Sequence, residues 1–164
     1  MKRQRKKYKT PVRPWDKQRL EKERELVKTY GLKNKKEIWK TLTFLRKYRT
    51  IARELAAKKD KETEKALIKK LVVMGLLSEG ANLDDVLGLT MENVLDRRLQ
   101  TILFKKGLVT TIAQARQLIV HRKVVIEERK IVYPSYLVSA DEENKIQVLM
   151  QIKQKEIKSP EVVQ

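Results

Sequence analysis

The sequence predicts a mainly α-helical protein with a basic arm at its N-terminus and a small α+β domain toward its C-terminal end. Apolar residues recur at helical spacing between residues 16 and 120, which predicts several amphipathic helices. Beyond His121 they form short runs rich in Val and Ile, which is typical of strands. We expect an arm over 1–15, a helical region over 16–90, a small domain of two short helices packed on a small sheet over 91–150, and a polar tail over 151–164.

Charge is the strongest signal in the composition. The 164 residues include 39 Lys and Arg against 21 Asp and Glu, which gives a formal net charge of +18. Such an excess repels itself in a compact fold unless an anionic partner neutralises it. Nucleic acid is the expected partner. An anionic membrane is the alternative, but the basic residues are spread along the chain rather than confined to one amphipathic helix. We therefore expect no membrane partner.

Several function classes are excluded by what the sequence lacks. There is no Cys, so neither a disulfide framework nor a Cys-based zinc site can form. The glycines are scattered singly rather than in a phosphate-binding loop, and His121 is the single histidine. We predict no enzymatic activity, no catalytic or metal-binding residue, no cofactor and no small-molecule substrate. A charged N-terminus and the lack of a long apolar run predict a cytoplasmic protein.

The N-terminal arm carries positive charge without one acidic residue before Asp16. Pro11 and Pro14 discourage a helix, and Tyr8 and Trp15 add aromatic faces that can stack on bases or riboses. We expect the arm to be disordered in water and to become ordered on a polyanion. Its expected contacts with nucleic acid are Arg3, Arg5, Lys6 and Lys7.

In the helical region, Asp16 is expected to cap a surface-exposed helix that ends near Tyr30, and Asn34 a long helix with Glu37 in its first turn. The long helix has an apolar side formed by Ile38, Leu42, Leu45, Ala52 and Leu55. Its other side carries Arg46, Lys47, Arg49 and Arg53, with no acidic residue between Glu37 and Glu54. This clustering favours contact with nucleic acid over plain solvation. A polar linker over 58–64, a helix over 66–74 ended by Gly75, a turn over 78–80 and a helical turn over 83–87 follow.

Two helices and short strands are predicted for the small domain. The first helix should span 91–106, between the cap Thr90 and Gly107, and would place Arg98 and Lys105 on one face with Arg97 beside them. The second should open at Thr111 with a capping box to Gln114, and should expose Gln117 and His121 with Arg116 on their rim, while Leu118 packs inward. The expected strands are 124–126, 131–132, 136–138 and 145–149, with turns over 127–130 and 141–144.

These segments resemble a known family. A-x-A-R-Q-L-I-x-H at 113–121, V-V-I at 124–126 and P-S-Y-x-V at 134–138 are similar to the S-four RNA-binding domain. Y-G-L-K-N-K-K-E-I-W at 30–39, G-L-T-M-E-N-V-L-D-R-R-L-Q-T at 88–101 and F-K-K-G-L at 104–108 are similar to the archaeal and eukaryotic branch of the ribosomal S-four family. The turns depart from the family pattern, because Glu127-Glu128-Arg129 and residues 141–144 stand where Asn-Gly and Gly-Asp are common.

The resemblance implies a structural constituent of the small ribosomal subunit. Such a protein would bind small-subunit ribosomal RNA at a multi-helix junction, nucleate assembly and contribute to translational accuracy beside a neighbour such as ribosomal protein S-five. The helical region over 16–90 would share in that binding. The alternative is a stand-alone S-four-domain RNA-binding factor in RNA modification or ribosome rescue.

The RNA contacts of the small domain are expected on its basic outer faces. A-form RNA is recognised by its shape, phosphates and 2′-hydroxyls, and the planar fork of arginine binds a phosphate at two points. We therefore expect contacts first from Arg97, Arg98 and Arg116, and then from Lys105, Lys106, Gln117, Arg122 and Lys123. His121 is added because the resemblance slightly favours contact with a phosphate or 2′-hydroxyl over a role in ending its helix. Gln114 fits a capping role and an RNA role equally.

Overall fold

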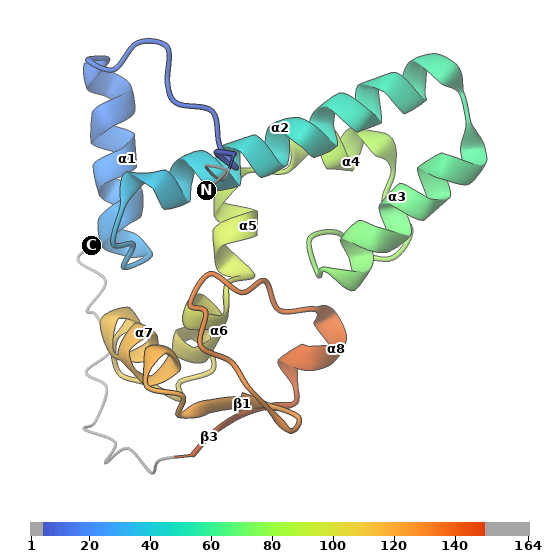
Figure 1. Ribbon diagram of the computed structural model, residues 1–164. Helices are drawn as coiled ribbons and strands as arrows, with labels where there is room; N and C mark the ends of the chain where they lie inside the picture. The colour runs from blue at the N-terminus through green and yellow to red at the C-terminus, as the bar shows by residue number, and fades with distance from the viewer. Residues whose placement is uncertain (1–4, 150–164) are drawn as a thin grey trace, which may run out of the picture.

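The structure is a computed structural model that describes residues 5–149. The helices α1 (Lys17–Thr29), α2 (Lys35–Lys58), α3 (Lys61–Val73) and α4 (Leu83–Gly88) lie at one end of the molecule (Figure 1). The helices α6 (Leu99–Lys105) and α7 (Ile112–Val120), a small sheet and the short helix α8 (Ala140–Glu143) lie at the other end, and α5 (Met91–Asp96) runs between the two. The predicted tail over 151–164 and Arg3 fall outside the described residues.

The caps predicted for the first two helices are confirmed. The side chain of Asp16 accepts a hydrogen bond from the amide of Arg19, and that of Asn34 accepts one from the amide of Lys36. The first helix is mostly exposed, as expected, but α1 buries Glu23 against its neighbours. Capping is decided by local sequence and could be predicted, whereas the burial of Glu23 depends on α2.

The helix α3 begins earlier than predicted. Lys59 adopts a left-handed conformation that ends α2, and Asp60 already occupies the N-cap position of α3. Acidic residues in the first turn, Glu62 and Glu64, suit the positive end of the helix dipole. The expected linker over 58–64 therefore reduces to a tight turn, from which α3 folds back along α2 (Figure 1).

The single helix predicted over 91–106 is divided in two. Arg97 closes α5, and Arg98 has extended backbone angles and precedes α6. At this break the amide of Leu99 donates to the carbonyl of Tyr136 at 2.8 Å, and the amide of Val138 donates to the carbonyl of Arg97 at 3.0 Å. The helix stops because its backbone pairs with residues 136–138, which form a bridge here rather than the expected strand. Arg98 and Lys105 therefore do not share one helix face.

The sheet is antiparallel with the order β2-β1-β3. Its strands are β1 (Val124–Ile126), β2 (Arg129–Lys130) and β3 (Ile146–Val148). Ile126 pairs with Arg129, so the turn consists of Glu127 and Glu128 alone, and the predicted second strand over 131–132 was placed too late. Glu127 adopts a positive φ of 56°, which such a turn requires. The turn expected over 141–144 is mostly α8, which Ser139 and Glu142 close with a capping box.

The sheet and the helices α6 and α7 enclose one core, as predicted for this domain. α6 contributes Leu99, Ile102 and Leu103, α7 contributes Ala115 and Ile119, and all of β1 is buried. The helical region has its own core between α2, α3, α4 and α5, formed by Leu45, Tyr48, Ala52, Leu67, Leu71, Leu76, Val86, Leu89 and Val94. A third, smaller cluster of Leu32, Ile38 and Leu95 packs α5 against the beginning of α2.

Candidate nucleic-acid interface

Arg98 lies inside the protein, so the expectation that it lies on an exposed outer face was wrong, whereas its contact with RNA stays a prediction. The residue is 3% exposed, and its guanidinium donates a hydrogen bond to Glu37 of α2. This ion pair joins residues 61 positions apart in the sequence. A buried charge must be paired, and Glu37 is its partner.

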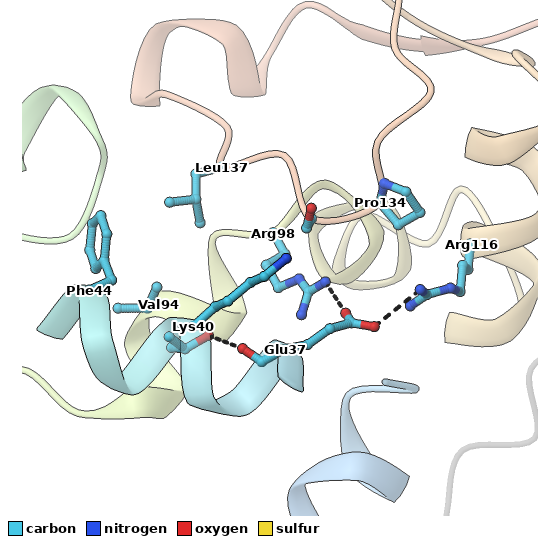
Figure 2. Close-up of a pocket in the computed structure, with 10 residues that line it drawn as sticks. Glu37, Lys40, Phe44, Val94, Arg98, Arg116, Pro134 and Leu137 are labelled. Carbon is cyan, nitrogen blue, oxygen red and sulfur yellow. Dashed lines mark hydrogen bonds and ion pairs between the residues drawn. The ribbon is translucent and has the colours of Figure 1, made fainter. Parts of the chain in front are cut away.

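Arg116 approaches the same carboxylate from α7. One of its nitrogens donates to Glu37 at 3.1 Å, and the other lies 3.5 Å from the side-chain oxygen of Gln100. Figure 2 shows Glu37 between the two guanidinium groups. Arg116 is half-buried rather than on the exposed rim where we expected it, although its neighbours Gln117 and His121 are exposed. Both arginines therefore connect the small domain to α2.

The electrostatics of this cluster keep Glu37 ionised. Burial raises the pKa of the Glu37 carboxyl, but the hydrogen bonds and charges of Arg98 and Arg116 outweigh it, so the pKa lies below its ordinary value. Burial also lowers the pKa of Arg98, although its guanidinium stays charged at any physiological pH. The three charges line a pocket of about 370 Å³ together with Lys40 (Figure 2). The apolar side of the pocket is formed by Phe44, Val94, Pro134 and Leu137.

Arg97 forms a second connection at the joint. It donates to Glu143 of α8 at 2.6 Å and to the carbonyl of Val138 at 3.0 Å. Its guanidinium lies against the backbone of Gly75, where a Cβ atom would come within 2.6 Å of the Arg97 Cζ. Gly75 has a φ of +66°, which ends α3 as predicted. Arg97 thus holds the end of α3 beside α8, and its role in RNA contact stays a prediction.

Most of the other predicted contact residues are on the surface. Exposed side chains belong to the arm, the outer face of α2 and the small domain: Arg5, Lys6, Lys7, Arg46, Arg53, Lys105, Lys106, Gln117, His121 and Arg122. Lys123 is half-buried. Arg49 is also half-buried and donates to the carbonyl of Leu89 at 2.6 Å, so it connects α2 to the end of α4. Lys105 pairs with Asp96 at 2.9 Å, and Lys106 donates to the carbonyl of Glu143.

The sequence pattern did not indicate that Glu37 and Lys40 line this pocket. Glu37 was recognised only as a residue of the first turn of its helix, and it does accept a hydrogen bond from the amide of Lys33 at 3.3 Å. The available signal was its position as the last carboxylate before a long basic stretch. Lys40 follows Glu37 by one helical turn and lines the same pocket. The capping box predicted between Thr111 and Gln114 is only half formed. The side chain of Gln114 accepts from the amide and hydroxyl of Thr110 rather than from the amide of the N-cap Thr111.

Comparisons with known proteins identify the family to which the chain belongs. A family model described as S4 domain matches residues 97–144. The chain is 49% identical over 145 residues to Small ribosomal subunit protein uS4 of Methanothermobacter thermautotrophicus, which covers 87% of this chain and 85% of the relative. It is 54% identical over 147 residues to the protein of that name from Hyperthermus butylicus, and the match covers 87% of this chain and 83% of that relative. The chain belongs to the uS4 family.

Membership of the uS4 family confirms the resemblance seen in the sequence motifs. A third relative of the same name, from Nanoarchaeum equitans, is 49% identical over 150 residues, which cover 88% of this chain and 83% of the relative. These relatives are archaeal and are named as ribosomal proteins rather than as enzymes. Within residues 5–149, no helix is long and apolar enough to cross a membrane.

Proposed function

We propose that the chain is a structural constituent of the small ribosomal subunit and binds small-subunit ribosomal RNA. The observation that carries this proposal is the identity of about one half to proteins named Small ribosomal subunit protein uS4, over more than four fifths of their length. The match to the S4 domain and the net charge of +18 support the same conclusion. Such a charge suits a polyanion, because each neutralised phosphate releases condensed counterions.

The proposed contact surface consists of the exposed cations, supported by the inward-facing arginines. Arg46 and Arg53 of α2, the loop after α7 with Arg122, and the arm can reach phosphates without breaking an internal ion pair. Arg98 is buried on Glu37, so it acts by fixing the small domain against α2. Arg97 and Arg116 have internal partners as well, and any contact with RNA would be additional to these bonds.

The proposal also specifies the RNA site of the protein, its role in the subunit and its neighbour. We propose that it binds where several RNA helices meet, nucleates assembly and contributes to translational accuracy, with a neighbour such as ribosomal protein S-five, in the cytoplasm. The divisions at 1–15, 16–90 and 91–150 remain part of this proposal. The helical region and the small domain have separate cores, which supports two units, although Val94 of α5 belongs to the core of the helical region.

A crosslinking experiment tests the function. The chain would be incubated with total RNA from Methanothermobacter thermautotrophicus, crosslinked by ultraviolet light and purified, and the bound RNA sequenced. We expect reads to concentrate in one confined region of the small-subunit ribosomal RNA. Reads spread over both ribosomal RNAs in proportion to their abundance would indicate a non-specific basic protein and contradict the proposal. Reads concentrated in transfer RNA would instead favour an accessory factor.

A further inference from the structure

The N-terminal arm is attached to the helical region through a buried carboxylate. Glu23 of α1 is 3% exposed and accepts hydrogen bonds from Arg19 at 2.9 Å and from the indole nitrogen of Trp39 at 3.1 Å. Lys35 forms an ion pair with its other oxygen at 3.4 Å. A carboxylate held by three groups from two helices fixes the position of Arg19, so the free end of that guanidinium has a defined direction.

Arg19 uses its remaining nitrogen to hold the turn that ends the arm. This nitrogen donates to the carbonyl oxygens of Arg13 and Pro14, both at 2.9 Å. Two backbone acceptors on one guanidinium leave this turn little freedom. We call the arrangement of Glu23, Arg19 and these two carbonyls the Arg19 clamp.

The two aromatic residues of the arm have different positions. Tyr8 is half-buried and packs on Trp39, with ring centroids 5.9 Å apart, and the amide of Lys9 donates to the hydroxyl of Thr43 at 3.1 Å. Trp15 follows the clamped turn directly and is 89% exposed. Tyr8 therefore attaches the arm to α2, whereas the ring of Trp15 is exposed to solvent.

We propose that the Arg19 clamp presents Trp15 as a stacking platform for an unpaired nucleobase of the bound RNA. The inference rests on the proposed function and adds a base contact to a surface otherwise built for phosphates. An indole can stack on any base because every base has a π face. The arm around it carries cations and no acidic residue before Asp16, which suits a polyanion that also bears aromatic rings.

The clamp explains why an exposed Trp at this place is useful for binding. A side chain on a disordered arm loses conformational freedom when it binds, and that loss weakens the complex. The Arg19 clamp fixes the backbone of the preceding residues before RNA arrives. Val12, three positions earlier, is exposed as well.

The first test compares affinities for a transcript of the small-subunit ribosomal RNA of Methanothermobacter thermautotrophicus. We expect Trp15→Ala to weaken binding by about 5- to 150-fold, which corresponds to the ~1–3 kcal/mol found for loss of one base–aromatic stack. Trp15→Phe should retain most of the affinity. The salt dependence should not change, because no charge is removed. Val12→Ala, in the same exposed turn, is the matched control and should bind like the wild-type chain.

Fluorescence gives a direct readout of stacking, because the chain contains only two Trp residues. RNA should quench the emission of the wild-type chain and leave that of Trp15→Phe nearly unchanged, since Trp39 is half-buried on Tyr8. Equal quenching in both would overturn the proposal, as would equal affinity of Trp15→Ala and the wild-type chain. If the wild-type chain itself fails to bind the transcript, the proposed function fails, so the two failures can be told apart.

A double-mutant cycle tests the role of the clamp. Arg19→Lys keeps the charge but cannot hold both carbonyls and Glu23 together, so it should weaken binding although Trp15 is present. Combined with Trp15→Ala, it should add little, because both changes remove the same interaction with the RNA. Full additivity would overturn the positioning role of Arg19. A thermal melt of each variant shows whether the protein is folded at the temperature of the binding assay.

Discussion

Glu37 is expected to hold the small domain against the helical region. The loss in the free energy of unfolding caused by Glu37→Gln measures this contribution. Glu37→Gln keeps the shape of the side chain and one acceptor oxygen but removes the charge shared by Arg98 and Arg116. The Arg98 side chain is only 4% exposed, so its charge would be left in the interior. Removing one partner of a buried ion pair costs about 3–5 kcal/mol. Because Gln still accepts one hydrogen bond, we expect a loss of about 2–4 kcal/mol in the free energy of unfolding.

Urea denaturation monitored by circular dichroism measures this loss. Glu54→Gln is the matched control, because Glu54 is an exposed carboxylate on the same helix. It should change the free energy of unfolding by less than about 0.5 kcal/mol. Equal effects of the two substitutions would refute the role assigned to Glu37.

The pH dependence of the same difference provides a second check. Arg98 and Arg116 outweigh burial and hold the pKa of Glu37 below its ordinary value. A carboxylate with a lowered pKa stabilises the fold above its unfolded pKa, and this stabilisation is lost as the pH falls through the folded value. The difference between the wild-type chain and Glu37→Gln should therefore be full at pH 7 and shrink below about pH 4. A difference that stays constant down to pH 2 would contradict the ion pairs.

Three further predictions concern stability and use the same urea assay. Gly75→Ala should cost about 1–3 kcal/mol, because φ is +66° there and a Cβ would meet Arg97, whereas Gly88→Ala, with open space and no positive φ, should be harmless. Ile119→Ala should cost about 2–5 kcal/mol at a fully buried site, against less than about 0.5 kcal/mol for the half-exposed Val120→Ala. Tyr8→Ala should cost about 0.5–1.5 kcal/mol because it removes the packing on Trp39, and an unchanged free energy of unfolding would instead favour the disordered arm expected from the sequence.

Local features of the fold could be predicted from the sequence. Asp16, Asn34, Thr90 and Thr111 cap their helices as expected, because a cap depends on the few residues beside it. Gly75 and Gly107 end helices at positive φ for the same reason. The S-four motifs likewise identified the small domain, which packs two helices on a sheet.

Features that depend on distant residues could not be predicted. The apolar spacing across residues 91–106 continues through Arg97 and Arg98, so nothing local shows that the helix breaks to pair with residues 136–138. The direction of Arg98 follows from Glu37, which lies far away in the sequence. An arginine in a basic stretch has the same local pattern whether it binds RNA or an internal carboxylate. Only the fold separates the two.

The salt dependence of RNA binding tests most directly whether the exposed cations of α2 contact the RNA. The affinity for small-subunit ribosomal RNA would be measured between 50 and 200 mM salt for the wild-type chain, for Arg46→Ala/Lys47→Ala/Arg53→Ala, and for Lys61→Ala/Lys65→Ala/Lys69→Ala. Both variants remove three exposed charges, from α2 and α3 respectively. We predict that the α2 variant makes the negative slope of log K against log salt shallower by about 2.7, at ~0.9 for each phosphate that is no longer neutralised, and that the α3 variant leaves the slope unchanged. Equal slopes for the two variants would contradict the proposed contact surface.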